Sequence, residues 1–151
     1  MTPEEALLIA VQAGINSPCC KSKRGVVIFN EHPLTGHLCT GWNSPPTGYT
    51  CTGTDTCRGN CSKVCVHAEQ AALLQALACG HPVTGMSMLH VKVEHGKAVY
   101  GGPPSCVSCS KLILDSRLRY MYLLESTSMS VVRYTAAEFH QATLKNLGLL
   151  E

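Results

Sequence analysis

The sequence is poor in aromatic residues, which make up 5% of its 151 positions, and its formal net charge is only +2. Proteins that hold single-stranded nucleic acid need a basic groove for the phosphates and aromatic platforms for the bases. The composition therefore argues against nucleic acid as a partner. No apolar run approaches the roughly 20 residues that a membrane-spanning helix needs, so we expect no membrane partner either.

The N-terminal segment lacks the basic start and the apolar run of a secretory signal. Residues 1–15 instead predict an amphipathic helix, with Glu4 and Glu5 where a signal peptide is positively charged. We therefore expect a cytoplasmic protein. In such a reducing compartment, metal ligation explains the ten cysteines better than disulfides do. A secreted domain cross-linked by disulfides is the alternative.

The length and the hydrophobic content of 45% fit a single domain, residues 1–151, with a core of its own. Caps and apolar spacing predict helices over residues 1–15, 67–79, 106–117 and 135–147, and β-branched or apolar runs predict strands over 25–29, 37–42, 88–93, 98–100 and 119–124, with a turn at 31–36. This alternation predicts an α/β fold, a three-layer α/β/α sandwich with a central mixed sheet.

Residues 43–62 show no apolar period and are rich in proline, glycine, threonine and cysteine. We predict an irregular loop here. A structureless segment of this length in a compact domain is usually functional or is held by something other than hydrophobic packing.

Two short stretches carry the chemistry. His67 and Glu69 stand at the start of one predicted helix, and Cys106 and Cys109 stand in the first turn of the next, with their sulfurs on one face. One imidazole and two thiolates give zinc three protein ligands and leave the fourth position to water, as catalytic zinc sites require. A zinc module that only binds would leave Glu69 without a role.

Glu69 lies two positions after His67, and residues two apart point to nearly opposite sides of a regular helix. Both side chains can face one metal only if the metal lies beyond the N-terminus of the helix. Two helix N-termini aimed at the metal would also favour thiolates and a bound hydroxide through their partial positive charge.

With these residues the sequence resembles the cytidine and deoxycytidylate deaminase superfamily, whose motif is His-x-Glu followed by Pro-Cys-x-x-Cys. The resemblance spans roughly residues 25–124, and segment 65–72 is most similar to deoxycytidylate deaminases. It implies that His67, Cys106 and Cys109 hold Zn²⁺ and that Glu69 moves protons. Ser105 departs from the motif, because the superfamily usually has proline directly before the first cysteine.

The resemblance also suggests substrate contacts. It implies that Asn43 contacts the sugar, that Ala68 contacts the substrate and that a basic segment binds the 5′-phosphate; of the basic residues here we favour Arg24 for its bidentate match to phosphate. The expected reaction is hydrolysis of dCMP to dUMP and ammonia, with a small-molecule nucleotide as substrate. An editing deaminase acting on tRNA or single-stranded DNA and a cytidine or other nucleoside deaminase are the alternatives.

The remaining cysteines suggest a second, structural zinc. Some deoxycytidylate deaminases carry one near this loop, and the pattern here resembles theirs. The preferred ligands are Cys51, Cys57 and Cys61 with Cys19 or Cys20, whereas Cys65 abuts His67 and is expected to point into the core. Solvated, reduced thiols are the alternative. By the same resemblance we expect a homo-oligomer.

Overall fold

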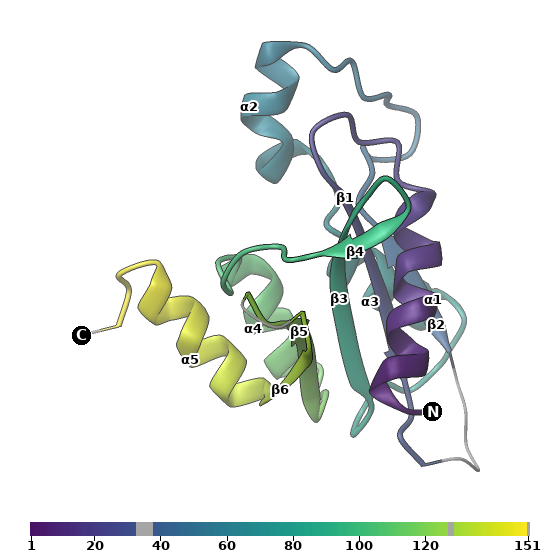
Figure 1. The fold of residues 1–151 in the computed structure, drawn as a ribbon, viewed down its shortest axis with the longest axis vertical. Helices are drawn as coiled ribbons and strands as arrows, with labels where there is room; N and C mark the ends of the chain where they lie inside the picture. Colours follow the sequence, from purple (N-terminus) through teal and green to yellow (C-terminus); the bar gives the residue numbers. More distant parts are fainter. Residues whose placement is uncertain (33–37, 127–128, 151) are drawn as a thin grey trace.

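The computed structural model describes residues 1–151 except 33–37, 127–128 and 151 (Figure 1). Its elements in chain order are α1 (Pro3–Ile15), β1 (Lys23–Phe29), β2 (Cys39–Trp42), α2 (Asp55–Val64), α3 (Ala68–Ala78), β3 (Ser87–Glu94), β4 (Lys97–Val99), α4 (Val107–Asp115), β5 (Tyr120–Leu124), β6 (Val131–Thr135) and α5 (Ala136–Asn146). Most of the predicted turn 31–36 lies outside the described residues.

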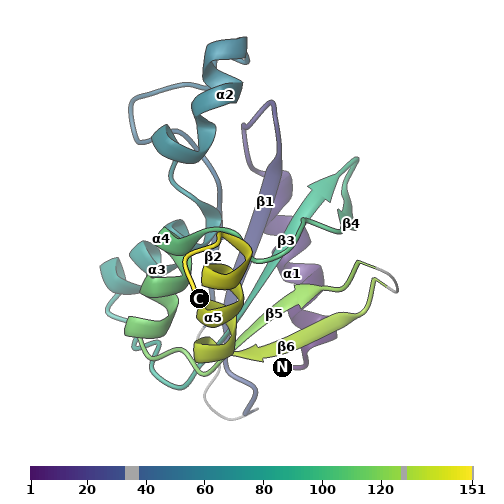
Figure 2. The same cartoon turned by 90° about the vertical axis from the view of Figure 1, so that its left-hand side faces the viewer.

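The described strands form one mixed sheet in the order β2-β1-β3-β5-β6, with β4 extending β3 as a hairpin. β3 and β5 are parallel, and the other neighbouring pairs are antiparallel. Helix α1 covers one face over β1 and β3, and α3, α4 and α5 lie on the other face (Figure 2). The predicted three-layer α/β/α sandwich with a central mixed sheet is confirmed.

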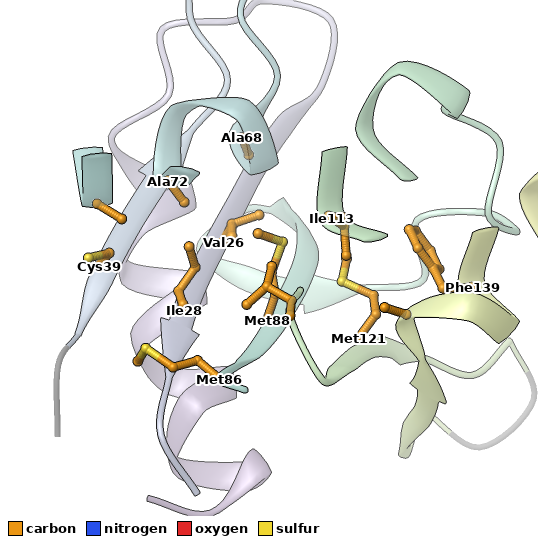
Figure 3. Close-up of a cluster of buried hydrophobic side chains, with 13 residues drawn as sticks. Val26, Ile28, Cys39, Ala68, Ala72, Met86, Met88, Ile113, Met121 and Phe139 are labelled. Atoms are coloured by element: carbon orange, nitrogen blue, oxygen red, sulfur yellow. The ribbon is translucent and has the colours of Figure 1, made fainter. Parts of the chain in front are cut away.

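Strand alternation divides the core into two clusters. Val27 and Phe29 of β1 face α1, whereas Val26 and Ile28 face the other way and pack with Met88 of β3 (Figure 3). This second cluster includes Ile113 of α4 and lies beneath the helices that carry the motif residues. The same alternation places Arg24 on that face, because successive side chains of a strand point to opposite sides.

Helix α3 lies unusually close to β2. A Cβ atom added to Gly41 would come within 2.5 Å of the carbonyl oxygen of Ala68, so only glycine permits this approach. The alanines at spacing four, Ala68, Ala72 and Ala76, are the buried face of the helix. The first turn of α3 is thereby held tightly against the sheet.

Two elements differ from the prediction. Residues 43–62 are not irregular throughout, since α2 begins at Asp55 with Thr54 as its N-cap. Helix α2 buries none of its residues and lies beyond the end of the sheet (Figures 1 and 2). Strand β6 is not predicted from the sequence, although it pairs with all five residues of β5. Among the described residues, no helix is long and apolar enough to cross a membrane.

Candidate metal centre and active site

Three side chains from two helices form a tight triangle. Nδ1 of His67 lies 3.2 Å from Sγ of Cys109 and 3.3 Å from Sγ of Cys106, and the two sulfurs are 3.2 Å apart. In the described part of the chain this is the one set of three such side chains whose donor atoms all lie within 4.8 Å of one another. The structure thus brings together the three ligands that the sequence suggests.

The helix starts position this triangle. His67 is the N-cap of α3, and Cys106 is the N-cap of α4 with Cys109 in its first turn. The side chain of Gln70 accepts a hydrogen bond from the backbone N–H of His67 at 3.0 Å and fixes its main chain. Both helix N-termini therefore meet at the triangle, where their partial positive charge favours thiolates.

The orientation of the His67 ring is set by Ser62. Nε2 of His67 lies 2.8 Å from the carbonyl oxygen of Ser62. A carbonyl only accepts hydrogen bonds, so Nε2 carries a proton and donates it. Nδ1, which faces both sulfurs, is then the nitrogen available to a metal, as in metal sites where a second hydrogen bond fixes the tautomer.

The protonation of the triangle is unequal. The Cys109 thiol donates to Cys106 and, with His67 and Ser108, lowers the pKa of Cys106 to about 3. The proton held between the sulfurs, together with burial and the Glu69 carboxylate, raises the pKa of Cys109. The hydrogen bond to Cys106 raises the pKa of His67 to about 9. A metal must displace the protons on Cys109 and on Nδ1, so it binds more tightly as pH rises.

The donor set and its dimensions fit zinc. A zinc ion bonded at about 2.3 Å to sulfur and about 2.0 Å to nitrogen holds tetrahedral ligands roughly 3.5–3.8 Å apart. The observed separations are shorter by a few tenths of an ångström. Small side-chain rotations can supply that difference.

Glu69 lies beside the triangle without joining it. Glu69 is buried, with 9% of its surface exposed. Its Oε2 lies 3.7 Å from Sγ of Cys109 and its Oε1 lies 3.7 Å from Nε2 of His90. The Glu69 carboxylate thus lies next to the three candidate metal ligands but is not one of them. From this position it can exchange protons with a molecule bound at the centre.

The triangle opens into a pocket of about 490 Å³, which suits a small organic ligand. Arg24, Asn43, Ala68 and Glu69 all line it, so the predicted substrate contacts share one cavity with the predicted ligands. The segment 101–105 and the side chains of Phe139 and Leu147 form other parts of its wall.

Arg24 is held rigidly in this wall. Its Nε donates to Oγ of Ser22 at 2.9 Å and one terminal nitrogen donates to the carbonyl oxygen of Gly101 at 3.1 Å. Burial lowers the pKa of Arg24, and the negative charge of Glu69 opposes that effect. These two bonds to described residues occupy two of its five N–H groups, and the other three can bind a ligand.

Asn43 joins three segments at the pocket edge. Its Oδ1 accepts from the backbone N–H of Arg24 and from Oγ of Ser17, both at 2.8 Å, and its Nδ2 donates to the carbonyl oxygen of Ser22 at 2.7 Å. One amide N–H is left for a substrate. Ala68 contributes the first residue of α3, whose backbone N–H is not used by the helix.

Comparison with solved structures identifies the fold. No family model and no curated protein matches the sequence. The cytidine deaminase of Burkholderia pseudomallei is similar over 92% of this chain and 96% of its own, with a TM-score of 0.65 and 19% identity. The chain has the cytidine deaminase fold. The dCMP deaminase of cyanophage S-TIM5 is similar over 85% of this chain and 88% of its own (TM-score 0.59, 24% identity), and its complex with dCMP and dUMP over 80% and 81% (0.60, 23%).

Within this cytidine deaminase fold, serine replaces the expected proline before Cys106 without displacing the cysteine. Cys106 adopts an extended N-cap conformation (φ −111°, ψ 99°) with serine before it. The carbonyl oxygen of Pro104 accepts a hydrogen bond of 2.8 Å from Nδ2 of Asn146 at the end of α5. The departure at Ser105 therefore leaves both cysteines at the centre.

The cysteines predicted for a second zinc gather in pairs. Sγ of Cys51 lies 3.9 Å from Sγ of Cys57, the neighbouring Cys51 raises the pKa of Cys20, and Cys19 is among the groups that, with burial, raise the pKa of Cys61. Among the described residues, no three of these sulfurs lie within 4.8 Å of one another. Cys65 is half-buried and lines the pocket, so the expectation that it points into the core is wrong.

His90 is a site residue that the sequence pattern does not single out. It lies on β3, lines the pocket and faces Glu69. A signal was available, because position 90 shares a strand face with Met88 and interrupts its apolar character with an imidazole.

Proposed function

We propose that this protein is a zinc-dependent deaminase of cytosine nucleotides that converts dCMP to dUMP and ammonia in pyrimidine nucleotide metabolism. The observation that carries this proposal is the triangle of His67, Cys106 and Cys109 beside the Glu69 carboxylate, opening on one pocket. A hydrolytic zinc site is expected to have three protein ligands, a fourth position open to water and a nearby carboxylate that is not a ligand.

Zinc held by these three residues would supply a water that is nucleophilic at neutral pH. Glu69 would take one proton of this water and give it to the pyrimidine ring nitrogen next to the carbon under attack. It would then take the remaining proton of the same oxygen and deliver it to the exocyclic amine, so that the carbon–nitrogen bond breaks, ammonia leaves and a carbonyl group remains on the ring. Its burial keeps bulk water away from these transfers.

The contacts in the pocket support a nucleotide as substrate. Arg24 has three N–H groups left for the phosphate, and Asn43 has one for a sugar hydroxyl. The similar S-TIM5 dCMP deaminase has been solved with dCMP and dUMP, which supports the same ligand class here. Ammonia release from a panel of dCMP, deoxycytidine, cytidine and single-stranded DNA tests the proposal, and release from none of them contradicts it.

We predict that Arg24→Ala lowers kcat/KM for dCMP about ten- to a hundredfold, because a charge-assisted hydrogen bond to phosphate contributes about 1.5–3 kcal/mol. Turnover of deoxycytidine, which has no phosphate, should change far less. Lys23→Ala is the matched control, since Lys23 is the preceding residue of β1, is exposed and does not line the pocket. Equal efficiency of the wild type on dCMP and deoxycytidine would contradict a phosphate site.

Two alternatives keep the same chemistry. A preference for cytidine or deoxycytidine would make the protein a nucleoside deaminase. Turnover of single-stranded DNA or tRNA would make it an editing enzyme, which the net charge of +2 and the 5% aromatic content do not favour.

We also propose a second, structural zinc held by cysteines of the loop. Helix α2 has no buried residue, and packing therefore contributes little to ordering it. Hydrogen bonds join it to the segment before β1: Nζ of Lys21 donates to the carbonyl oxygen of Arg58, and Arg58 donates to that of Cys20. Thiolates from both sides of this contact, Cys51, Cys57 and Cys61 with Cys19 or Cys20, would let a metal hold the two segments together.

If the loop cysteines bind a second zinc, we expect about two metal ions per chain in protein purified without chelator. The reason is that the loop cysteines and the triangle of His67, Cys106 and Cys109 share no ligand. Cys57→Ser should reduce this content to about one and lower the melting temperature while dCMP turnover largely persists. Cys79→Ser is the control, since Cys79 is an exposed thiol at the end of α3. A content of one zinc in the wild type would show that the loop thiols bind no metal.

We infer a single-domain, cytoplasmic homo-oligomer. All ten cysteines are free thiols, in keeping with a reducing compartment. Leu74 and Leu77 of α3 are 58% and 77% exposed, as expected of a helix that meets another copy of the chain.

A further inference from the structure

His90 lines the pocket from the central strand β3. Only 14% of its side chain is exposed, and Val26 of β1 is its partner in the sheet register. β3 is paired on both sides, with β1 and β5, so its backbone is fixed. Val26 and Met88, which neighbour position 90 in the register and along β3, belong to the cluster in Figure 3.

A buried imidazole needs a hydrogen-bond partner, since burying an unsatisfied polar group costs free energy. The charged and titratable groups around His90 are Glu69 and His67 of α3, Arg24 of β1 and Cys106 of α4. The carboxylate of Glu69 is an acceptor within reach, with Oε1 at 3.7 Å from Nε2 of His90. Burial lowers the pKa of His90, so the ring is neutral and has one N–H to donate.

Glu69 needs an orienting contact of this kind. A glutamate side chain has three rotatable bonds, and proton transfer requires one of its oxygens at a defined position. Oε2 faces the metal ligands through Cys109, and Oε1 faces His90. A separation of 3.7 Å is long for a hydrogen bond, but contacts of catalytic groups often shorten only when the substrate is bound.

We propose that His90 is a positioning residue that donates Nε2–H to Oε1 of Glu69 and holds the carboxylate for proton transfer. This inference rests on the deaminase function proposed above and adds to it a residue outside the zinc-binding motifs. His90 acts through Glu69 and contacts neither the metal nor the reacting atoms.

Three variants test the role by activity. His90→Leu should lower kcat for dCMP about ten- to a hundredfold, the usual cost of losing a residue that orients a functional side chain, with KM and zinc content unchanged. His90→Gln should recover most of this loss, because its amide nitrogen reaches the place of Nε2. His90→Asn, whose amide reaches only the place of Nδ1, should not recover it. Wild-type kcat in His90→Leu, or equal rates in the Gln and Asn variants, would overturn the proposal.

A spectroscopic measurement on the purified full-length protein needs neither activity nor a stable variant of His90. In protein with ¹⁵N-labelled histidine, the nitrogen spectrum should show Nε2 of His90 protonated, and Glu69→Gln should shift its signals. An unprotonated Nε2 would overturn the proposal even if the enzyme deaminates dCMP. Failure of the wild type on every cytosine substrate would instead reject the proposed function and leave the contact to be judged by this spectrum.

Discussion

Replacing Glu69 by glutamine is expected to lower kcat for deamination about a thousandfold, since proton transfer by a positioned side chain contributes about 10²–10⁴ to rate. Glutamine has nearly the same shape and polarity as glutamate but cannot accept and return a proton. The measurement is ammonia release from dCMP at saturating substrate. Glu4→Gln, an exposed glutamate in the first turn of α1, should retain full activity.

The same variant should keep its fold and its zinc. Glu69 is not one of the three residues of the triangle, and its Oε2 lies 3.7 Å from Sγ of Cys109. Removing a buried negative charge also relieves its desolvation cost, so the melting temperature should be unchanged or slightly higher. Zinc loss from Glu69→Gln would mean that the carboxylate is a ligand and that its catalytic role is misassigned.

Much of the architecture could be predicted because local signals agree with it. Thr2 and Glu5, spaced as in a capping box, make both of its hydrogen bonds at the start of α1. Thr135 caps α5 as its position before an amphipathic stretch indicates. Such caps depend on residues three or four apart, and sequence displays these directly.

Burial was harder to predict, because it depends on how closely elements approach. Apolar spacing favours Leu7, Leu8, Val11 and Ile15 as the apolar stripe of α1. Val11 is buried and Leu7 packs against the core, but Leu8 is 70% exposed and Ile15 41%. The face toward the sheet is built from small residues that include Ala10 and Gly14, because α1 lies directly against Gly25 of β1. Close helix–sheet contact selects alanine and glycine, which hydrophobic patterns undervalue.

Helix α2 and strand β6 were not predicted from the sequence, for different reasons. Helix α2 contains Gly59 and Asn60, which are poor helix formers, and it has no apolar face. It contacts Cys20 and Lys21, which are distant in sequence, so no apolar pattern within residues 55–64 predicts the helix. Strand β6 carries Val131, Val132 and Tyr134, which have strong strand propensity. The prediction missed this strand although its local signal is present, because residues 131–135 lead directly into the predicted helix that begins at 135.

The metal centre could be predicted by residue type, whereas its supporting contacts could not. A histidine and two cysteines at helix starts indicate a zinc site from spacing alone. The hydrogen bond that orients His67 on the carbonyl oxygen of Ser62, and the approach of His90 to Glu69, become visible only when sheet register and loop path are known. Such contacts depend on main-chain position, which residue type does not encode.

Cys106→Ala is expected to remove the catalytic zinc and nearly all activity together. Cys106 is the proposed ligand that most readily forms a thiolate, because its hydrogen bonds lower its pKa to about 3. Alanine leaves His67 and Cys109 as two ligands, where zinc sites of this kind use at least three. Metal analysis should therefore show about one zinc fewer per chain than in the wild type.

The loss in Cys106→Ala differs from that in the other two variants. Glu69→Gln should keep all its metal and lose turnover, and Cys57→Ser should lose one metal and keep most of its turnover. Only Cys106→Ala should lose both, because its thiolate holds the metal that activates water. Added zinc should restore little activity, since Cys109 and His67 each give up a proton to bind it and no third ligand offsets that cost. Full zinc content and wild-type turnover in Cys106→Ala would place the metal centre elsewhere in the chain.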